Sequence, residues 1–238
     1  MELGEIISDA IKYPLNNVKA LLIYIVLSII MALVLVFGGL GILGATDLTG
    51  FAANGLSFAG IVGIIIALCI GLLIEGYMLD VIKFGISKDE GAPEIDFGRQ
   101  VINGIKYFIL AIVYFIIPII VYALLAKWQI AAIIIGIILF IIFGLAFLMA
   151  ICKLAETESL GAALNITAAI KDISNVGLVK IIAIAIVFII LTFIVSFIAS
   201  LFGNGTIGGI IGAIISGICS TYLTFFYHRA IGLAYSDA

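Results

Sequence analysis

Residues 19–47 read KALLIYIVLSIIMALVLVFGGLGILGATD, with no charged side chain between Lys19 and Asp47. A bilayer core about 30 Å thick requires roughly 20 apolar residues in helical form. This run exceeds that length, and in lipid a helix satisfies all of its backbone polar groups within one segment. The valine and isoleucine content would favour strands in water, but the length of the run favours a membrane-spanning helix.

The composition of the whole chain agrees with a lipid environment. Of the 238 residues, 65% are hydrophobic and 11% are charged, whereas soluble domains carry roughly 45–50% apolar and about 25% charged residues. The net charge of −3 does not indicate nucleic-acid binding. Three cysteines without a motif spacing and a single histidine indicate no disulfide framework and no metal site, and we expect no cofactor.

Six apolar runs are long enough to cross a bilayer. They lie near residues 20–44, 58–80, 107–126, 129–152, 179–202 and 207–228. We therefore expect an all-α membrane protein with six transmembrane helices, in which residues 1–238 form a single integral membrane domain.

The basic residues predict the orientation of these spans. If the N-terminus is cytoplasmic, all 11 Lys and Arg residues except Lys127 fall on the cytoplasmic side. Cytoplasmic loops of membrane proteins are enriched in Lys and Arg. We therefore expect a multi-pass protein of the plasma membrane with both termini in the cytoplasm and the lipid bilayer as its main partner.

The opening residues MELGEIISDAIKYPLNN (1–17) place apolar and charged side chains on opposite faces of a helix. A secretory signal would begin with basic residues, whereas this stretch begins with acidic ones. We expect a short amphipathic helix in the cytoplasmic interface. Pro14 should end this helix, and Asn16 or Asn17 should cap the span that follows.

Two later stretches have the same character. Residues 93–108 offer Asp96 as a helix cap, and residues 155–176 end in Ser174 and Asn175, which favour a break. The tetrapeptides AIKY (10–13), GIKY (104–107) and AIKD (169–172) each precede a pair of spans. One interpretation is a repeat of three units, each an interfacial helix followed by a helical hairpin. The other is chance, because cytoplasmic loops attract lysine and tyrosine.

Two features of the spans concern helix packing. Small residues recur at every fourth position of the sixth span, as Gly208, Gly212, Ser216 and Ser220. Because small residues let membrane helices approach closely, we expect a packing seam here, within the chain or between copies in a homo-oligomer. Pro118 lies in the middle of the third span and should kink that helix.

Glu75 is an ionisable residue well within a span. A charge at the bilayer centre costs about 2.5–3.5 kcal/mol, so we expect Glu75 to have a partner at similar depth, namely His228, Arg229 or Lys153. Asp80 can pair at the interface with Lys83, three residues further on. The candidate polar network comprises Glu75, Asp80, Lys83, His228 and Arg229. It either binds a proton or a ligand or only fixes the register of the helices.

The stretch EGYMLDVIKFGISKDEGAPEIDFGRQVINGIKYFILAIVYFIIPII (75–120) resembles the signature region of a family catalogued as domain of unknown function four thousand and thirteen. The matching residues are Gly76, Tyr77, Lys83, Pro93, Glu94, Asp96, Gly104, Lys106 and Tyr107. The segments SDAIKYPLNN (8–17), AETESLGAAL (155–164) and YHRAIGLAY (227–235) are also similar to blocks of this family. The resemblance implies a polytopic membrane protein of a mainly archaeal family and supplies no activity.

Three classes of function are compatible with these features. The sequence favours a non-enzymatic protein that organises lipid or a membrane partner, because amphipathic helices are expected along one leaflet. The alternative is a small-solute or lipid transporter that uses Glu75 and the kink at Pro118. An intramembrane enzyme would need a nucleophile with a base, or a metal site, and the scarcity of such residues leads us to expect no catalytic residues.

Overall fold

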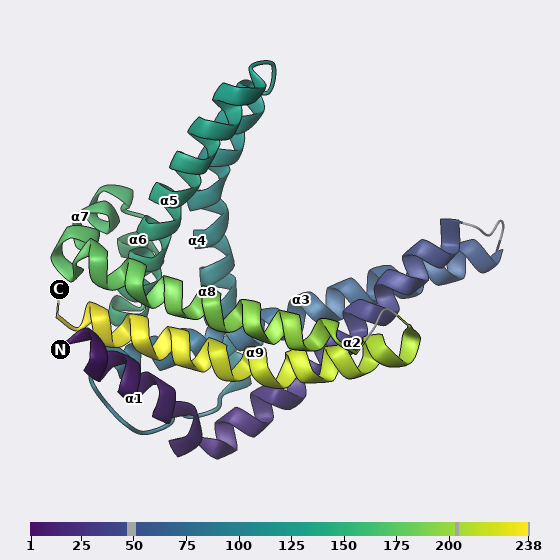
Figure 1. Ribbon diagram of the computed structural model, residues 1–238, viewed down its shortest axis with the longest axis horizontal. Helices are drawn as coiled ribbons and strands as arrows, with labels where there is room; N and C mark the ends of the chain where they lie inside the picture. The colour runs from purple at the N-terminus through teal and green to yellow at the C-terminus, as the bar shows by residue number, and fades with distance from the viewer. Residues whose placement is uncertain (47–50, 203–204, 238) are drawn as a thin grey trace.

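The computed structural model describes residues 1–46, 51–202 and 205–237 (Figure 1). These residues form helices and no strand, which confirms the predicted all-α fold. The helices in the described residues are α1 (Leu3–Asn16), α2 (Val18–Thr46), α3 (Phe51–Ile86), α4 (Phe97–Leu124), α5 (Gln129–Thr157), α6 (Leu160–Ala163), α7 (Ile166–Val176), α8 (Leu178–Ser200) and α9 (Thr206–Tyr235).

Six of these helices, α2, α3, α4, α5, α8 and α9, are long and apolar enough to cross a membrane. They correspond one to one with the six predicted spans, and they indicate a multi-pass membrane protein. Consecutive helices pack together as the hairpins α2–α3, α4–α5 and α8–α9. The turns predicted around Asp47 and Asn204 lie outside the described residues.

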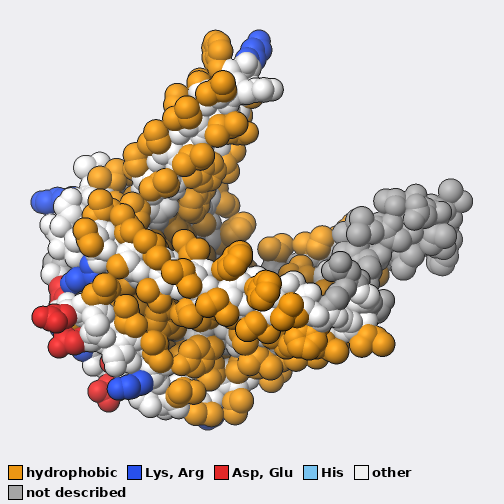
Figure 2. All heavy atoms as spheres, in the orientation of Figure 1, with side chains coloured by type: hydrophobic (Ala, Val, Ile, Leu, Met, Phe, Trp, Pro, Cys, Tyr) orange, Lys and Arg blue, Asp and Glu red, His pale blue; other side chains and the backbone are white. Residues whose placement is uncertain are grey.

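The three hairpins share one end and diverge toward the other (Figure 1). Both termini and the short helices α1, α6 and α7 lie at the shared end. Figure 2 shows that charged side chains gather there, whereas hydrophobic side chains cover the helices beyond it. Among the described Lys and Arg residues Lys127 is the exception, because it lies in the turn between α4 and α5 at the tip of a hairpin. We call the shared end the charged end.

The buried core also lies toward the charged end. Tyr24 of α2 stacks on Tyr77 of α3 with ring centroids 4.3 Å apart, and Phe225 of α9 packs against both rings. Ile6 and Ala10 of α1 are fully buried in a second cluster, which includes Ile82 of α3 and Phe226 of α9. Part of the apolar face of α1 therefore contacts protein, where the sequence suggested contact with the membrane interface.

The prediction that Pro14 ends the first helix is wrong, because α1 continues to Asn16. Proline removes one N–H group and disturbs the preceding turn, but here it lies in the last turn, where little helix remains to be disturbed. The hydroxyl of Tyr222 donates to the nearby carbonyl of Ile11 at 2.5 Å. The side-chain amide of Asn17 donates to the carbonyl of Tyr13 at 3.0 Å, so Asn17 closes α1.

The predicted separate interfacial helix before the third span is also wrong. Asp96 does cap a helix, since its carboxylate accepts from the backbone N–H of Arg99 at 3.1 Å. That helix is α4, which runs without a break from Phe97 into the span. The region before the fifth span does hold two short helices, α6 and α7, and α7 is capped by Asn165. The three-unit repeat stays a prediction.

Candidate functional site

Two glycines set the geometry of the candidate site. A Cβ atom on Gly76 of α3 would lie 1.8 Å from the backbone oxygen of Gln100, and one on Gly104 of α4 would lie 2.0 Å from that of Leu72. No other residue type could occupy either position at this separation of α3 and α4. The crossing places the polar end of α3 beside the polar start of α4.

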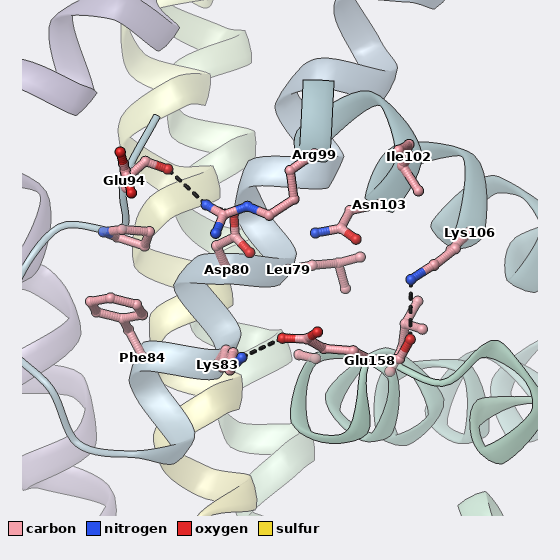
Figure 3. Close-up of a pocket in the computed structure, with 13 residues that line it drawn as sticks. Leu79, Asp80, Lys83, Phe84, Glu94, Arg99, Ile102, Asn103, Lys106 and Glu158 are labelled. Carbon is pink, nitrogen blue, oxygen red and sulfur yellow. Dashed lines mark hydrogen bonds and ion pairs between the residues drawn. The ribbon is translucent and has the colours of Figure 1, made fainter. Parts of the chain in front are cut away.

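A cavity of about 610 Å³ lies at the charged end, between α3, the start of α4 and the end of α5 (Figure 3). We call it the polar cavity. Its charged lining residues are Asp80, Lys83, Glu94, Arg99, Lys106 and Glu158. Apolar side chains, including Leu79, Ile102 and Leu154, form the rest of the wall. The cavity therefore offers both cations and carboxylates next to hydrocarbon.

Most of these charges are already paired with each other. Arg99 Nη2 contacts Asp80 Oδ2 at 3.1 Å and donates to the backbone oxygen of Glu94 at 2.8 Å. Lys83 forms an ion pair with Glu158, and its ammonium lowers the pKa of the Glu158 carboxyl below its usual range. The predicted pair of Asp80 with Lys83 is thus wrong, because each finds a partner from another part of the chain.

Lys106 differs from the other two cations. Its Nζ donates to the backbone oxygen of Glu158 at 3.1 Å, and no described carboxylate lies within ion-pair distance of it. The side chain of Asn103 lies one turn away and points into the same space (Figure 3). Lys106 and Asn103 therefore present hydrogen-bond donors to the polar cavity.

Glu75 and His228 form a second polar group, deeper in the spans. Glu75 Oε2 lies 3.7 Å from His228 Nε2, and among the described residues this buried oxygen has no hydrogen-bond partner. His228 Nδ1 lies 2.8 Å from the backbone oxygen of Thr224. Glu75 also lies in the wall of a cavity of about 330 Å³ between α2, α3 and α4, which we call the apolar cavity. His228 is one of the three partners that the sequence proposed for Glu75.

Arg229 does not join Glu75. It is 1% exposed, and its Nε contacts Asp9 Oδ1 at 2.7 Å. It also donates to the backbone oxygens of Phe84 and Asp89 and lies over the ring of Tyr13. Successive helical residues point about 100° apart, so His228 and Arg229 face different neighbours.

Lys153, the third proposed partner of Glu75, pairs with Glu156 at 3.0 Å. The candidate polar network is therefore three separate groups: Glu75 with His228, Asp80 and Lys83 at the polar cavity, and Arg229 with α1. The tertiary structure separates residues that the sequence placed together by depth alone.

The predicted seam on α9 faces α8. A Cβ on Gly212 would lie 3.4 Å from the backbone oxygen of Ala199, and Ser216 and Ser220 line a small cavity beside α8. Gly208 lies one turn earlier on α9. Tighter helix contacts occur at two further glycines: Gly217 lies outside this spacing, whereas Gly232 continues it. A Cβ on Gly217 would lie 2.9 Å from Ile29 of α2, and one on Gly232 would lie 2.5 Å from the backbone oxygen of Ile82.

Pro118 is a buried residue within α4, which continues beyond it to Leu124. One turn earlier, the hydroxyl of Tyr114 donates to the backbone oxygen of Ala163 at 3.0 Å, which ties α4 to α6. Neither residue lines the polar or the apolar cavity.

Sequence reasoning about single spans missed three of the important polar residues. Gln100 is 0% exposed, and its Oε1 accepts from the hydroxyl of Tyr24 at 2.6 Å. Asn103 and Glu158 both line the polar cavity. The three-residue spacing of Asn103 and Lys106 was a usable signal, because residues three apart lie on the same face of a helix.

A family model described as "Protein of unknown function (DUF4013)" matches residues 59–221, from α3 into α9. This match confirms the resemblance found around Glu75–Ile120. It does not reach SDAIKYPLNN (8–17) or YHRAIGLAY (227–235), so it is narrower than the likeness inferred from those segments. No curated protein and no solved structure matches the chain.

Proposed function

Because the chain belongs to the DUF4013 family of proteins of unknown function, we propose its function from the site: it is a non-enzymatic multi-pass membrane protein that holds a phospholipid headgroup in the polar cavity. Through this contact it would organise lipid around the charged end of the molecule. The observation that carries the proposal is that the polar cavity, which also has hydrocarbon walls, contains Asn103 and Lys106, a cation without a described carboxylate partner.

The position of the polar cavity supports a lipid ligand. It lies at the charged end, where the last residues of α3 and α5 meet the first residues of α4, which is the depth of headgroups in a bilayer. Leu79, Ile102 and Leu154 would contact the upper part of an acyl chain, and the polar side chains would contact the headgroup. A phospholipid has a polar headgroup and apolar chains, so one molecule can contact both the polar and the apolar side chains of the wall.

The charges suggest how the headgroup would be oriented. Lys83 and Arg99 are neutralised by Glu158 and Asp80, so Lys106 is the cation available for a phosphate. A hydrogen bond from lysine to phosphate is charge-assisted and about twice as strong as a neutral one. The carboxylate of Glu94 lies at the same cavity and would attract an amino group of a headgroup.

The segregation of charge supports a cytoplasmic position for the charged end, in the plasma membrane. Of the Lys and Arg residues, only Lys127 lies in the turn between α4 and α5, at the opposite end of that hairpin. Cytoplasmic segments of membrane proteins are enriched in Lys and Arg. Cytoplasmic leaflets carry anionic lipids, which cationic side chains attract by about 1 kcal/mol each.

The test is retention of phospholipid by purified protein. Wild type, Lys106→Gln and Lys127→Gln would be extracted in the same mild detergent, washed, and weighed by native mass spectrometry. We expect wild type and Lys127→Gln to retain phospholipid and Lys106→Gln to retain about tenfold less, as expected for one charge-assisted contact. Equal retention by Lys106→Gln would reject the site. Conversion of the bound lipid to a product would reject the non-enzymatic assignment.

A further inference from the structure

The apolar cavity has a composition unlike that of the polar cavity. Among the described residues that line it, Glu75 is the only charged one, and apart from Tyr107 the rest are apolar. Several of its lining side chains, including Ile64, Leu68 and Phe108, are exposed on the hydrophobic surface of the spans. The cavity therefore opens toward the region that lipid chains would fill, and a ligand could enter from the bilayer.

The geometry at Glu75 leaves a hydrogen-bonding position unfilled. A backbone carbonyl only accepts, so His228 Nδ1 must carry the hydrogen in its contact with Thr224. In a neutral imidazole, Nε2 then has a lone pair, and it faces the carboxylate oxygen Glu75 Oε2 at 3.7 Å. Two acceptors in an apolar place repel each other unless a positive charge or a proton lies with them.

We propose that the apolar cavity binds a lipophilic organic cation, with the cationic centre beside Glu75. Without such a ligand, the Glu75–His228 pair holds one proton and is neutral overall. When the cation enters, that proton leaves for the solvent, the carboxylate becomes the counter-ion and His228 is neutral. The total charge of the site is the same before and after the exchange.

The wall of the cavity supports a cation in preference to an uncharged lipid. The rings of Tyr107 and Phe108 lie in the wall with Glu75. Aromatic rings attract cations, more strongly where water is excluded. A carboxylate, two rings and hydrocarbon together match the charge and the apolar substituents of such a molecule.

The proton exchange depends on few neighbouring groups. The described titratable groups that face Glu75 are His228 of α9 and Tyr107 of α4. Met31 and Leu35 are the contributions of α2 to the cavity, and α5 contributes none of the lining residues. No other described cation competes for the carboxylate of Glu75, because Arg229 pairs with Asp9 and Lys153 with Glu156.

The test uses tetraphenylphosphonium, a lipophilic cation that carries no exchangeable proton. The full chain is placed in phosphatidylcholine nanodiscs, and binding is measured by calorimetry in two buffers that differ in ionisation enthalpy, with empty nanodiscs subtracted. We expect saturable binding with one proton released per cation. Glu75→Gln should weaken binding about tenfold or more, whereas Glu90→Gln, which removes a carboxylate outside the cavity, should leave it unchanged.

A second variant tests the cavity with the carboxylate retained. Gly71 lies in the cavity wall, and a Cβ atom there would meet open space, so Gly71→Phe fills the cavity without a backbone clash. It should weaken binding about tenfold, by exclusion of the ligand. Gly144→Phe, at another glycine with open space around it, is the matched control.

Several results would overturn the proposal. These are absence of saturable binding, equal affinity of wild type and Glu75→Gln, and equal affinity of wild type and Gly71→Phe. Saturable binding without proton release would overturn the exchange step. Phospholipid retention at Lys106 is a separate measurement on separate residues, so failure of one site leaves the other intact.

Discussion

Gly76 on α3 and Gln100 on α4 are in backbone contact: a Cβ atom on Gly76 would lie 1.8 Å from the carbonyl oxygen of Gln100. Any side chain at position 76 would therefore clash with the main chain of α4. Rotation of a side chain could not relieve this clash, because the Cβ atom and the carbonyl oxygen are both fixed by the backbone. The pair fixes how α3 crosses α4, and with it the positions of Asp80, Arg99 and Lys106 around the polar cavity.

Gly76→Ala should therefore lower the free energy of unfolding by about 3 kcal/mol, at the upper end of overpacking effects. Thermal unfolding in detergent would measure it. Gly71→Ala is the control on the same helix, since a Cβ there meets open space. It should be neutral or stabilising by up to about 1 kcal/mol, as alanine is the better helix former. Equal stability of the two variants would show that α3 and α4 do not cross at Gly76.

Arg229→Met should destabilise the protein by about 3 kcal/mol, because it leaves Asp9 and two backbone oxygens without their buried donor. Arg99→Met is the comparison, since the Arg99 side chain is 45% exposed although it also pairs with a carboxylate. Its cost should be about 1 kcal/mol or less. Chemical denaturation of both variants would measure the difference, and similar costs would contradict the buried role of Arg229.

Tyr24 and Gln100 should be coupled energetically. Tyr24→Phe and Gln100→Met should each cost about 1–2 kcal/mol, because each leaves a buried polar atom of the other residue without its partner. The double variant should cost less than the sum, since it removes both polar groups, including the unpaired Nε2 of Gln100. A double-mutant cycle on thermal unfolding gives the coupling energy. Strictly additive costs would mean that the hydrogen bond contributes nothing.

The ion pair of Lys83 with Glu158 should stabilise the protein only above acid pH. The Glu158 carboxyl has a lowered pKa in the folded protein, so it binds a proton less readily there than in the unfolded chain. Its contribution is therefore complete above the unfolded pKa of about 4.3 and is lost as pH falls through the lower folded value. Because Glu158 is exposed, we expect about 0.5 kcal/mol at most.

The measurement is the difference in melting temperature between wild type and Lys83→Gln from pH 7 to pH 3. The difference should shrink toward zero below about pH 4. A difference that stays constant over this range would show that the pair is not formed in solution.

Labels placed at Lys127 and at Lys88 should report opposite sides of the membrane. In a variant that lacks Cys69, Cys152 and Cys219, single cysteines at these two positions would be treated with a membrane-impermeant reagent in intact cells. We expect labelling at position 127 alone, because the charged end is proposed to be cytoplasmic. Labelling of both positions from outside would contradict the proposed orientation.

The sequence was sufficient to predict the all-α fold and the positions of the six long helices. In hydrocarbon each segment must satisfy its own backbone, so the length of an apolar run specifies a helix without reference to the rest of the fold. The gathering of basic residues at one end was also predictable, because six spans place every Lys and Arg except Lys127 on the same side.

Only the tertiary structure decided which charged groups meet. Asp80 could pair with Lys83 along its own helix, but Arg99 of α4 takes that place, and Arg229 turns toward α1 while its neighbour His228 turns toward Glu75. Hydropathy reports the depth of a residue, whereas its partner depends on the rotation of each helix and on where two helices cross. Those quantities are set by close contacts such as Gly76 with Gln100, which join residues far apart in the chain.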